Sequence, residues 1–203
     1  MDVTNVTAGA DVFTCNVWLA DGERPVLVDA GTMVGVEDVV ADHTSSLDAV
    51  ALTHQHGDHV ARVDAVLDRF DADLYANADH PRRTHTLADG DEILVGDELC
   101  EVVYTPGHAD DHVALVGDHS LFSGDVVVYN DGAFDDGSFG RTDNPGRSRE
   151  TLIESLEELV DRLPGRIQAM YPGHGDSFHG DVRAVIERAL ERAERREPKY
   201  PDE

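Results

Sequence analysis

Four side chains of metal-binding types fall within six residues, in the run His54-Gln55-His56-Gly57-Asp58-His59. His54 and His56 are two residues apart, so both project to the same side of an extended backbone. The glycine that follows lets the chain turn before the last two side chains. Burying four polar groups without partners costs several kcal/mol, so an ordinary core does not explain the run. The spacing predicts a tight turn whose side chains can reach two metal ions at once.

Three further potential ligands each follow a glycine later in the chain. Each stands where an apolar strand gives way to turn residues, and there a rigid scaffold can present ligands from distant segments. Imidazole and carboxylate groups without thiolate suit zinc, iron or manganese, and seven such ligands suit a binuclear centre with open positions for water. The three are His108 in Thr105-Pro106-Gly107-His108, Asp125 in Ser123-Gly124-Asp125, and His174 in Tyr171-Pro172-Gly173-His174.

Apolar periodicity predicts the elements that must position these motifs. Asp21-Gly22 supplies a hairpin turn between the first two expected strands. A Gly-, Asp- and Asn-rich stretch over residues 129–147 is expected to be irregular. We expect strands over residues 12–19, 25–31, 47–53, 74–76, 92–95, 101–104, 113–116, 120–122 and 167–171, and helices over 60–67, 152–163 and 181–196.

The chain is predicted to form one domain over residues 1–203, with no linker or repeat and no separate C-terminal helical substrate domain. No apolar run approaches the length of about 18 residues that a membrane span needs, and the first residues lack the features of a signal peptide. We therefore expect a cytoplasmic protein without membrane contact. Cys15 and Cys100 are expected to be reduced, partly buried thiols without a nucleophilic role.

The net charge is −26, with 42 acidic and 16 basic residues, and Lys199 is the one lysine. The acids are spread along the whole chain, which argues against an acidic disordered tail. At molar salt the Debye length falls to about 3 Å and screens their repulsion, so the composition is typical of a halophilic protein with an acidic surface. Such a surface does not attract nucleic acid, and we expect a small-molecule substrate. Nothing in the sequence indicates the oligomeric state.

From about Phe13 to His174 the pattern resembles the metallo-β-lactamase superfamily, including the early motif Val28-Asp29-Ala30-Gly31. The resemblance implies an α+β fold, a four-layer αβ/βα sandwich of two mixed β-sheets flanked by helices. The metals would lie at one edge between the sheets. In this family the aspartate at the position of Asp29 supports the centre without binding metal.

The resemblance also implies a role for each ligand. His54, His56 and His108 would hold one metal, Asp58, His59 and His174 would hold the other, and Asp125 would bridge them. Two divalent ions are implied, with zinc the first choice and iron or manganese the alternatives. A metal-bridging hydroxide would attack the substrate, and the catalytic Asp58 would orient it.

The segment from Gly137 to Gly146 contains Gly140-Arg141-Thr142-Asp143 and resembles glyoxalase II-like hydrolases and the related persulfide dioxygenases. True β-lactamases usually lack a histidine at the position of His59. The favoured function is hydrolysis of a thioester or related acyl substrate, with Arg141 as the candidate substrate-binding residue. A thiolate leaving group needs little protonation, so the absence of an obvious general acid is no objection.

Two alternatives stay open. A persulfide dioxygenase would use a single iron held by His54, His108 and Asp125. A phosphodiesterase or nuclease would use the basic cluster formed by Arg141 with Arg147 and Arg149, although we favour these arginines as solvated loop charges. An intact ligand set argues against a non-catalytic metal-binding protein.

The remaining histidines have no motif support. His112 and His179 lie close to ligands in the sequence, but we expect both at the surface.

Overall fold

Two mixed six-stranded sheets carry the fold in the computed structural model, which describes residues 1–143 and 146–199. The N-terminal sheet has the strand order β1-β2-β3-β4-β5-β6, and the C-terminal sheet has the order β14-β13-β10-β9-β8-β7. The N-terminal sheet comprises β1 (Asp2–Asn5), β2 (Trp18–Asp21), β3 (Val26–Val28), β4 (Ala49–Ala51), β5 (Asp73–Ala76) and β6 (His85–Thr86). The C-terminal sheet comprises β7 (Glu92–Val95), β8 (Glu98–Tyr104), β9 (Val113–Val116), β10 (Ser120–Gly124), β13 (Ala169–Pro172) and β14 (Phe178–His179).

A small antiparallel pair, β11 (Val127–Val128) with β12 (Ser138–Phe139), accompanies the two sheets. The helices are α1 (Val36–His43), α2 (Gly57–Val60), α3 (Val63–Phe70), α4 (Arg149–Arg162) and α5 (Val182–Glu194). Among the described residues, no helix is both long and apolar enough to cross a membrane.

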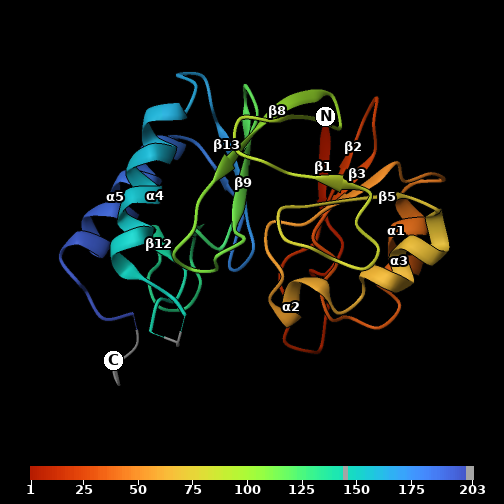
Figure 1. The fold of residues 1–203 in the computed structure, drawn as a ribbon, viewed down its shortest axis with the longest axis horizontal. Coiled ribbons are helices and arrows are strands. Elements are labelled where there is room, and N and C mark those ends of the chain that lie inside the picture. The colour runs from red at the N-terminus through yellow and green to blue at the C-terminus, as the bar shows by residue number, and fades with distance from the viewer. Residues whose placement is uncertain (144–145, 200–203) are drawn as a thin grey trace.

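The elements stack in four layers (Figure 1). Helices α4 and α5 cover the outer face of the C-terminal sheet, the two sheets face each other, and α1 and α3 cover the outer face of the N-terminal sheet. This arrangement confirms the predicted α+β sandwich of two mixed sheets flanked by helices.

Three apolar cores hold the layers together, because side chains alternate between the two faces of each strand. In β2 and β3, Leu19 and Leu27 face the helical layer, while Trp18 and Val28 face the other sheet. The Trp18 indole also crosses between the sheets, donating from Nε1 to the carbonyl of Pro172 over 2.9 Å.

Parallel pairing brings strand ends to a common edge. Strands β3 and β4 run parallel in one sheet, as do β10 and β13 in the other, so their carboxyl ends lead to shared edges. The predicted ligands follow three of these strands: His54 after β4, Asp125 after β10 and His174 after β13. The sandwich therefore presents them from rigid positions.

One expected strand was wrong in most of its length. Residues 12–17 carry strand-forming residues, yet strand β2 begins at Trp18. The backbone N–H of Cys15 donates to Asp58, and that of Asn16 donates to Gly173. These groups bond across the ligand-bearing loops instead of within a sheet, so the segment runs over the predicted site. Strand β1, helix α1 and the short strands β6, β11, β12 and β14 were not predicted, β12 because it lies in the expected irregular stretch.

We predict that Leu156→Ala lowers the free energy of unfolding by about 2–5 kcal/mol, because it leaves a cavity in the α4 core. Leu156 is 0% exposed, whereas Leu99 on β8 is 56% exposed and provides the matched control. Leu99→Ala should stay within about 0.5 kcal/mol of the parent chain in urea titrations followed by circular dichroism. Equal losses for the two variants would contradict the assignment of this core.

Candidate metal centre

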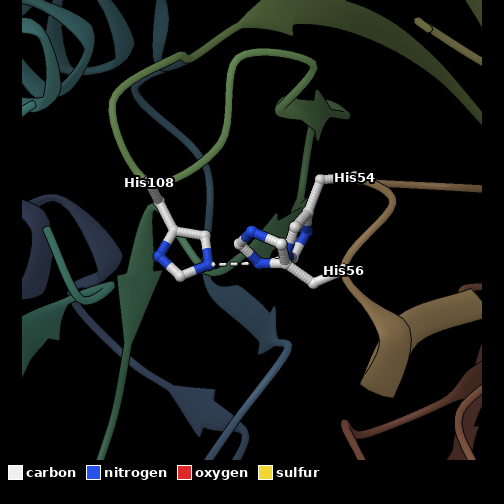
Figure 2. Close-up of side chains that lie close together, drawn as sticks. All are labelled: His54, His56 and His108. Atoms are coloured by element: carbon white, nitrogen blue, oxygen red, sulfur yellow. Dashed lines mark hydrogen bonds between the residues drawn. The ribbon is translucent and has the colours of Figure 1, made fainter. Parts of the chain in front are cut away.

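Three imidazoles meet between the two halves of the molecule. His54 and His56 lie in the turn after β4, and His108 reaches them from the loop between β8 and β9 (Figure 2). His56 Nδ1 is 2.8 Å from His54 Nε2 and 3.0 Å from His108 Nε2. One nitrogen of each ring lies within 4.8 Å of the others, so a single metal ion could contact all three.

A second cluster lies beside the first. It combines Asp58 and His59 from the single-turn helix α2 with His174 from the loop after β13. His174 Nε2 is 3.1 Å from Asp58 Oδ2. His59 is fully buried, whereas the other two side chains are partly exposed. This set could hold a second metal ion through imidazole and carboxylate ligands.

The buried carboxylate of Asp125 lies between the clusters. Its Oδ2 is 3.3 Å from His108 Nε2 in the first cluster and 3.6 Å from His174 Nε2 in the second. Its Oδ1 is 3.6 Å from His59 Nε2. The structure thus brings together all seven side chains that the sequence singled out, with Asp125 in contact with both sets.

Two polar atoms of the centre test whether metal ions would fit. His59 Nε2 and Asp125 Oδ1 are buried and have no hydrogen-bond partner among the described residues. Such atoms are rare, because burying an unpaired polar group costs free energy. Both can offer a lone pair, and imidazole with carboxylate is a ligand set for zinc, iron or manganese. A divalent cation bound between them would satisfy both atoms, so the residues fit.

Asp29 fixes the orientation of both clusters. Its Oδ2 accepts hydrogen bonds from His59 Nδ1 and from Thr53 Oγ1, each over 2.8 Å, and its Oδ1 accepts one from the Thr53 N–H over 2.9 Å. Because the Thr53 hydroxyl donates to Asp29, its oxygen accepts a hydrogen bond from His54 Nδ1–H over 3.1 Å. Both imidazoles therefore direct Nε2 into the centre, where His54 offers a lone pair and His59 offers one once its Nε2 proton is lost.

The other side of the centre is oriented by backbone. His108 Nδ1 donates to the carbonyl of Arg141 over 2.9 Å, which leaves the lone pair on Nε2. The Arg141 side chain itself is bound to Asp143. At this position the structure therefore shows a main-chain contact to His108 and a guanidinium that is already paired. Asn144 and Pro145 of the same sequence segment lie outside the described residues.

The surface position expected for His112 was wrong. His112 is 0% exposed, its Nδ1 donates to Thr105 Oγ1 over 2.8 Å, and its Nε2 accepts the Asp125 N–H over 2.9 Å. It therefore holds the backbone of the shared carboxylate in place. The signal in the sequence was its position directly before the buried strand that starts at Val113. His179 is exposed, as expected.

Two glycines of the motifs are required by close approach. A side chain at Gly173 would overlap Asp125 Oδ1, and one at Gly107 would overlap the backbone of Leu152 in α4. Gly107 also has a φ of 119°, in the region that favours glycine. At both Gly-His pairs, a residue larger than glycine before the histidine would therefore overlap a neighbouring group.

The imidazole pKa values are shifted in opposite directions in the two clusters. Burial lowers the pKa of His54 well below its ordinary value and lowers that of His108 to about 4. Burial, together with the charge of Arg147, also lowers the pKa of His56. The first cluster therefore consists of neutral imidazoles at pH 7, in the form that binds metal.

The second cluster behaves in the opposite way. Burial disfavours the charged forms of His59 and His174. Cys15 and the carboxylates of Asp29 and Asp125 outweigh it at His59, the carboxylates of Asp125 and Asp58 outweigh it at His174, and both pKa values are raised. Burial likewise opposes the charge on Asp58, but the hydrogen bond with His174 and the nearby imidazoles lower its pKa. Cys15 packs beside His59, and burial raises its pKa to about 11, so it is a neutral thiol at pH 7. Both cysteines are free and buried, as predicted for reduced thiols.

A cavity of about 450 Å³ opens onto both clusters. Phe13 lines it and stacks on His174 with ring centroids 5.5 Å apart, although 78% of Phe13 is exposed. Lys199 also lines it, where Nζ donates to the Phe139 carbonyl and pairs with Asp131, each over 2.6 Å. Neither Phe13 nor Lys199 belongs to a sequence motif, because only the folded chain brings them to the ligands.

Comparisons with known proteins agree with this architecture. The sequence profile of the metallo-beta-lactamase superfamily matches residues 10–198. A hydroxyacylglutathione hydrolase of Aliivibrio fischeri is 34% identical over 116 residues, which are 55% of this chain and 46% of that protein. The chain thus matches about half the length of this relative.

Solved structures share the fold. ETHE1 from Myxococcus xanthus superposes with a TM-score of 0.74 at 23% identity, covering 100% of this chain and 94% of that one. TTHA1623, solved in a di-iron-bound form, gives a TM-score of 0.66 at 26% identity, covering 88% and 98%. Because the profile match spans most of the chain and the same sandwich carries the ligand motifs, this protein belongs to the metallo-beta-lactamase superfamily.

Proposed function

We propose that this protein is a metal-dependent hydrolase with a binuclear centre that cleaves a thioester or a related acyl substrate. The observation that carries the proposal is the position of Asp125 between two clusters of ligand-type side chains. The first metal would be held by His54, His56 and His108, the second by Asp58, His59 and His174, and Asp125 would contact both.

Divalent ions at these positions, zinc first and iron or manganese as alternatives, would supply Lewis acidity and water with a pKa near neutrality. The chain supplies the rest. Asp58 lines the cavity as an ionised carboxylate, since its pKa is lowered, and can accept a hydrogen bond that orients the attacking water. Asp29 and the Arg141 carbonyl hold the imidazoles in the tautomers that this chemistry needs.

The thioester substrate is supported by the similarity to a hydroxyacylglutathione hydrolase and by the segment around Arg141. The di-iron-bound form of TTHA1623 supports a centre for two metals. The cavity of about 450 Å³ suits a small acyl compound. The acyl chemistry is carried over from the hydroxyacylglutathione hydrolase.

A dioxygenase with a single iron is the second candidate. It would use His54, His108 and Asp125, and the separation of 3.3 Å between His108 Nε2 and Asp125 Oδ2 is compatible with a shared ion. The hydrolase would need the second cluster for activity, whereas the dioxygenase would not. A variant that lacks a ligand of the second cluster therefore distinguishes the two functions.

We predict that Asp125→Ala lowers kcat for thioester hydrolysis by about 100- to 1000-fold, since it removes the carboxylate shared by both clusters. Hydrolysis of thioester, lactone and phosphodiester substrates should be compared, with Asp118→Ala as the control because Asp118 lies at the surface paired with Arg166. Full turnover by Asp125→Ala would refute the proposed centre. Oxygen uptake with a persulfide, retained in His59→Ala, would instead favour the dioxygenase.

We predict that Asp29→Asn weakens zinc affinity by about 10- to 100-fold, because the amide has one acceptor oxygen for three donors. Asparagine tolerates the left-handed φ of 63° at this position, so the backbone should be preserved. Asp71→Asn is the matched control, because Asp71 is exposed and has a φ of 53°. Competition with a chromophoric chelator gives the affinities, and equal affinities in both variants would contradict the role of Asp29.

The pKa directions predict two metal-binding steps with different pH dependence. The first cluster is neutral, with the pKa of His108 at about 4, so its affinity should change little between about pH 6 and 8. The raised pKa values of His59 and His174 mean that a second metal must displace protons, so its affinity should increase with pH. Zinc calorimetry in buffers of different ionisation enthalpy measures this release. Proton release confined to the first equivalent would reverse the assignment.

A further inference from the structure

Arg147 places a basic side chain in contact with the first cluster. Its guanidinium lines the cavity, with Nη2 at 3.3 Å from His56 Nε2 and Nη1 at 3.4 Å from the carbonyl of Arg141. The other cations of the cavity wall are paired, Arg141 with Asp143 and Lys199 with Asp131. In the described part of the chain, no carboxylate forms an ion pair with Arg147, and Asp143, whose carboxylate feels its charge, is paired with Arg141.

The contact between Arg147 and His56 is incompatible with metal binding. His56 faces the other two imidazoles through Nδ1, so Nδ1 is the atom that would bind the ion. A neutral imidazole that offers Nδ1 as a lone pair carries its proton on Nε2. The guanidinium has donors and no acceptor, so two donors would then face each other across 3.3 Å. Once the first cluster holds a metal, Arg147 needs another acceptor.

The cavity is also lined by an aromatic ring, that of Phe13. Phe13 stacks on His174, which belongs to the second cluster, whereas Arg147 contacts His56 of the first. A bound substrate would therefore meet an aromatic ring at one end and a guanidinium at the other. A carboxylate matches the guanidinium, because the two form parallel charge-assisted hydrogen bonds.

We propose that the cavity takes an acyl substrate that bears a carboxylate, and that Arg147 binds this carboxylate after metal binding frees it from His56. This inference rests on the proposed hydrolase function and adds a substrate class to it. Arg147 is a positioning residue for specificity: it orients the substrate and does not contact the bond that is cleaved. The carboxylate lies either in the acyl group or in the thiol.

Three thioesters test the substrate class. They are neutral S-butyryl-N-acetylcysteamine, S-succinyl-N-acetylcysteamine with a carboxylate in the acyl group, and S-butyryl-3-mercaptopropionate with a carboxylate in the thiol. The parent zinc-loaded protein should prefer one of the two carboxylates over the neutral compound by about 10- to 100-fold in kcat/KM. Arg147→Gln should lose that preference, because kcat/KM for the preferred carboxylate compound falls toward that for the neutral compound. Arg149→Gln is the matched control, since Arg149 contacts Thr142 and the Phe139 ring.

A binding measurement separates this inference from the proposed function. Glutarate and its monomethyl ester differ by one carboxylate, and calorimetry on the zinc-loaded protein should show about tenfold or tighter binding of glutarate. Arg147→Gln should bind the two equally, whereas Arg147→Lys should keep part of the difference. If the glutarate preference depends on Arg147 but no thioester is cleaved, the proposed function fails and the carboxylate site stands. If thioesters are cleaved but neither preference depends on Arg147, the inference is overturned.

Discussion

The buried carboxylate of Asp29 is the interaction on which the centre depends. It joins the end of β3 to Thr53 after β4 and to His59 in α2, and it sets the tautomers of His54 and His59 in different clusters. The backbone around it is equally tied, because the N–H groups of residues 30 and 31 both donate to the His59 carbonyl. One carboxylate thus connects the ends of two strands to the ligand-bearing turn and determines which nitrogen of each imidazole carries the proton. Asp29 makes these contacts from a left-handed backbone conformation, with a φ of 63°.

The packing of the sandwich brings the two clusters together into one site. Each sheet is fixed by an apolar core against its own helices, and a third core sets the separation of the two sheets. Asp125 comes from one sheet and Asp29 supports ligands after the other, so the core between the sheets determines how the two clusters meet. His112, the residue directly before β9, completes the arrangement by holding the Asp125 backbone after β10 of the same sheet.

The resemblance that the motifs carry to a known family implied the sandwich, and local sequence alone was enough to group the seven ligand-type residues, because their grouping depends on short spacings and strand ends. It failed where long-range packing decides. Residues 12–17 have strand-forming side chains, but their backbone bonds to the loops of the centre. His112 has no motif, and its role arises from contact with Asp125. The arginines expected in solvent also differ, since Arg147 contacts His56 and Arg149 packs on Phe139. The single-domain organisation, the halophilic character and the cytoplasmic location stay predictions.

Anomalous diffraction at the zinc edge, from crystals of the protein loaded with zinc, tests directly whether the two clusters hold two metal ions. We expect two peaks at about 2.0–2.2 Å from their nitrogen and oxygen ligands, one among His54, His56 and His108 and the other among Asp58, His59 and His174, with Asp125 touching both. A single peak, or peaks bound by other side chains, would contradict this expectation.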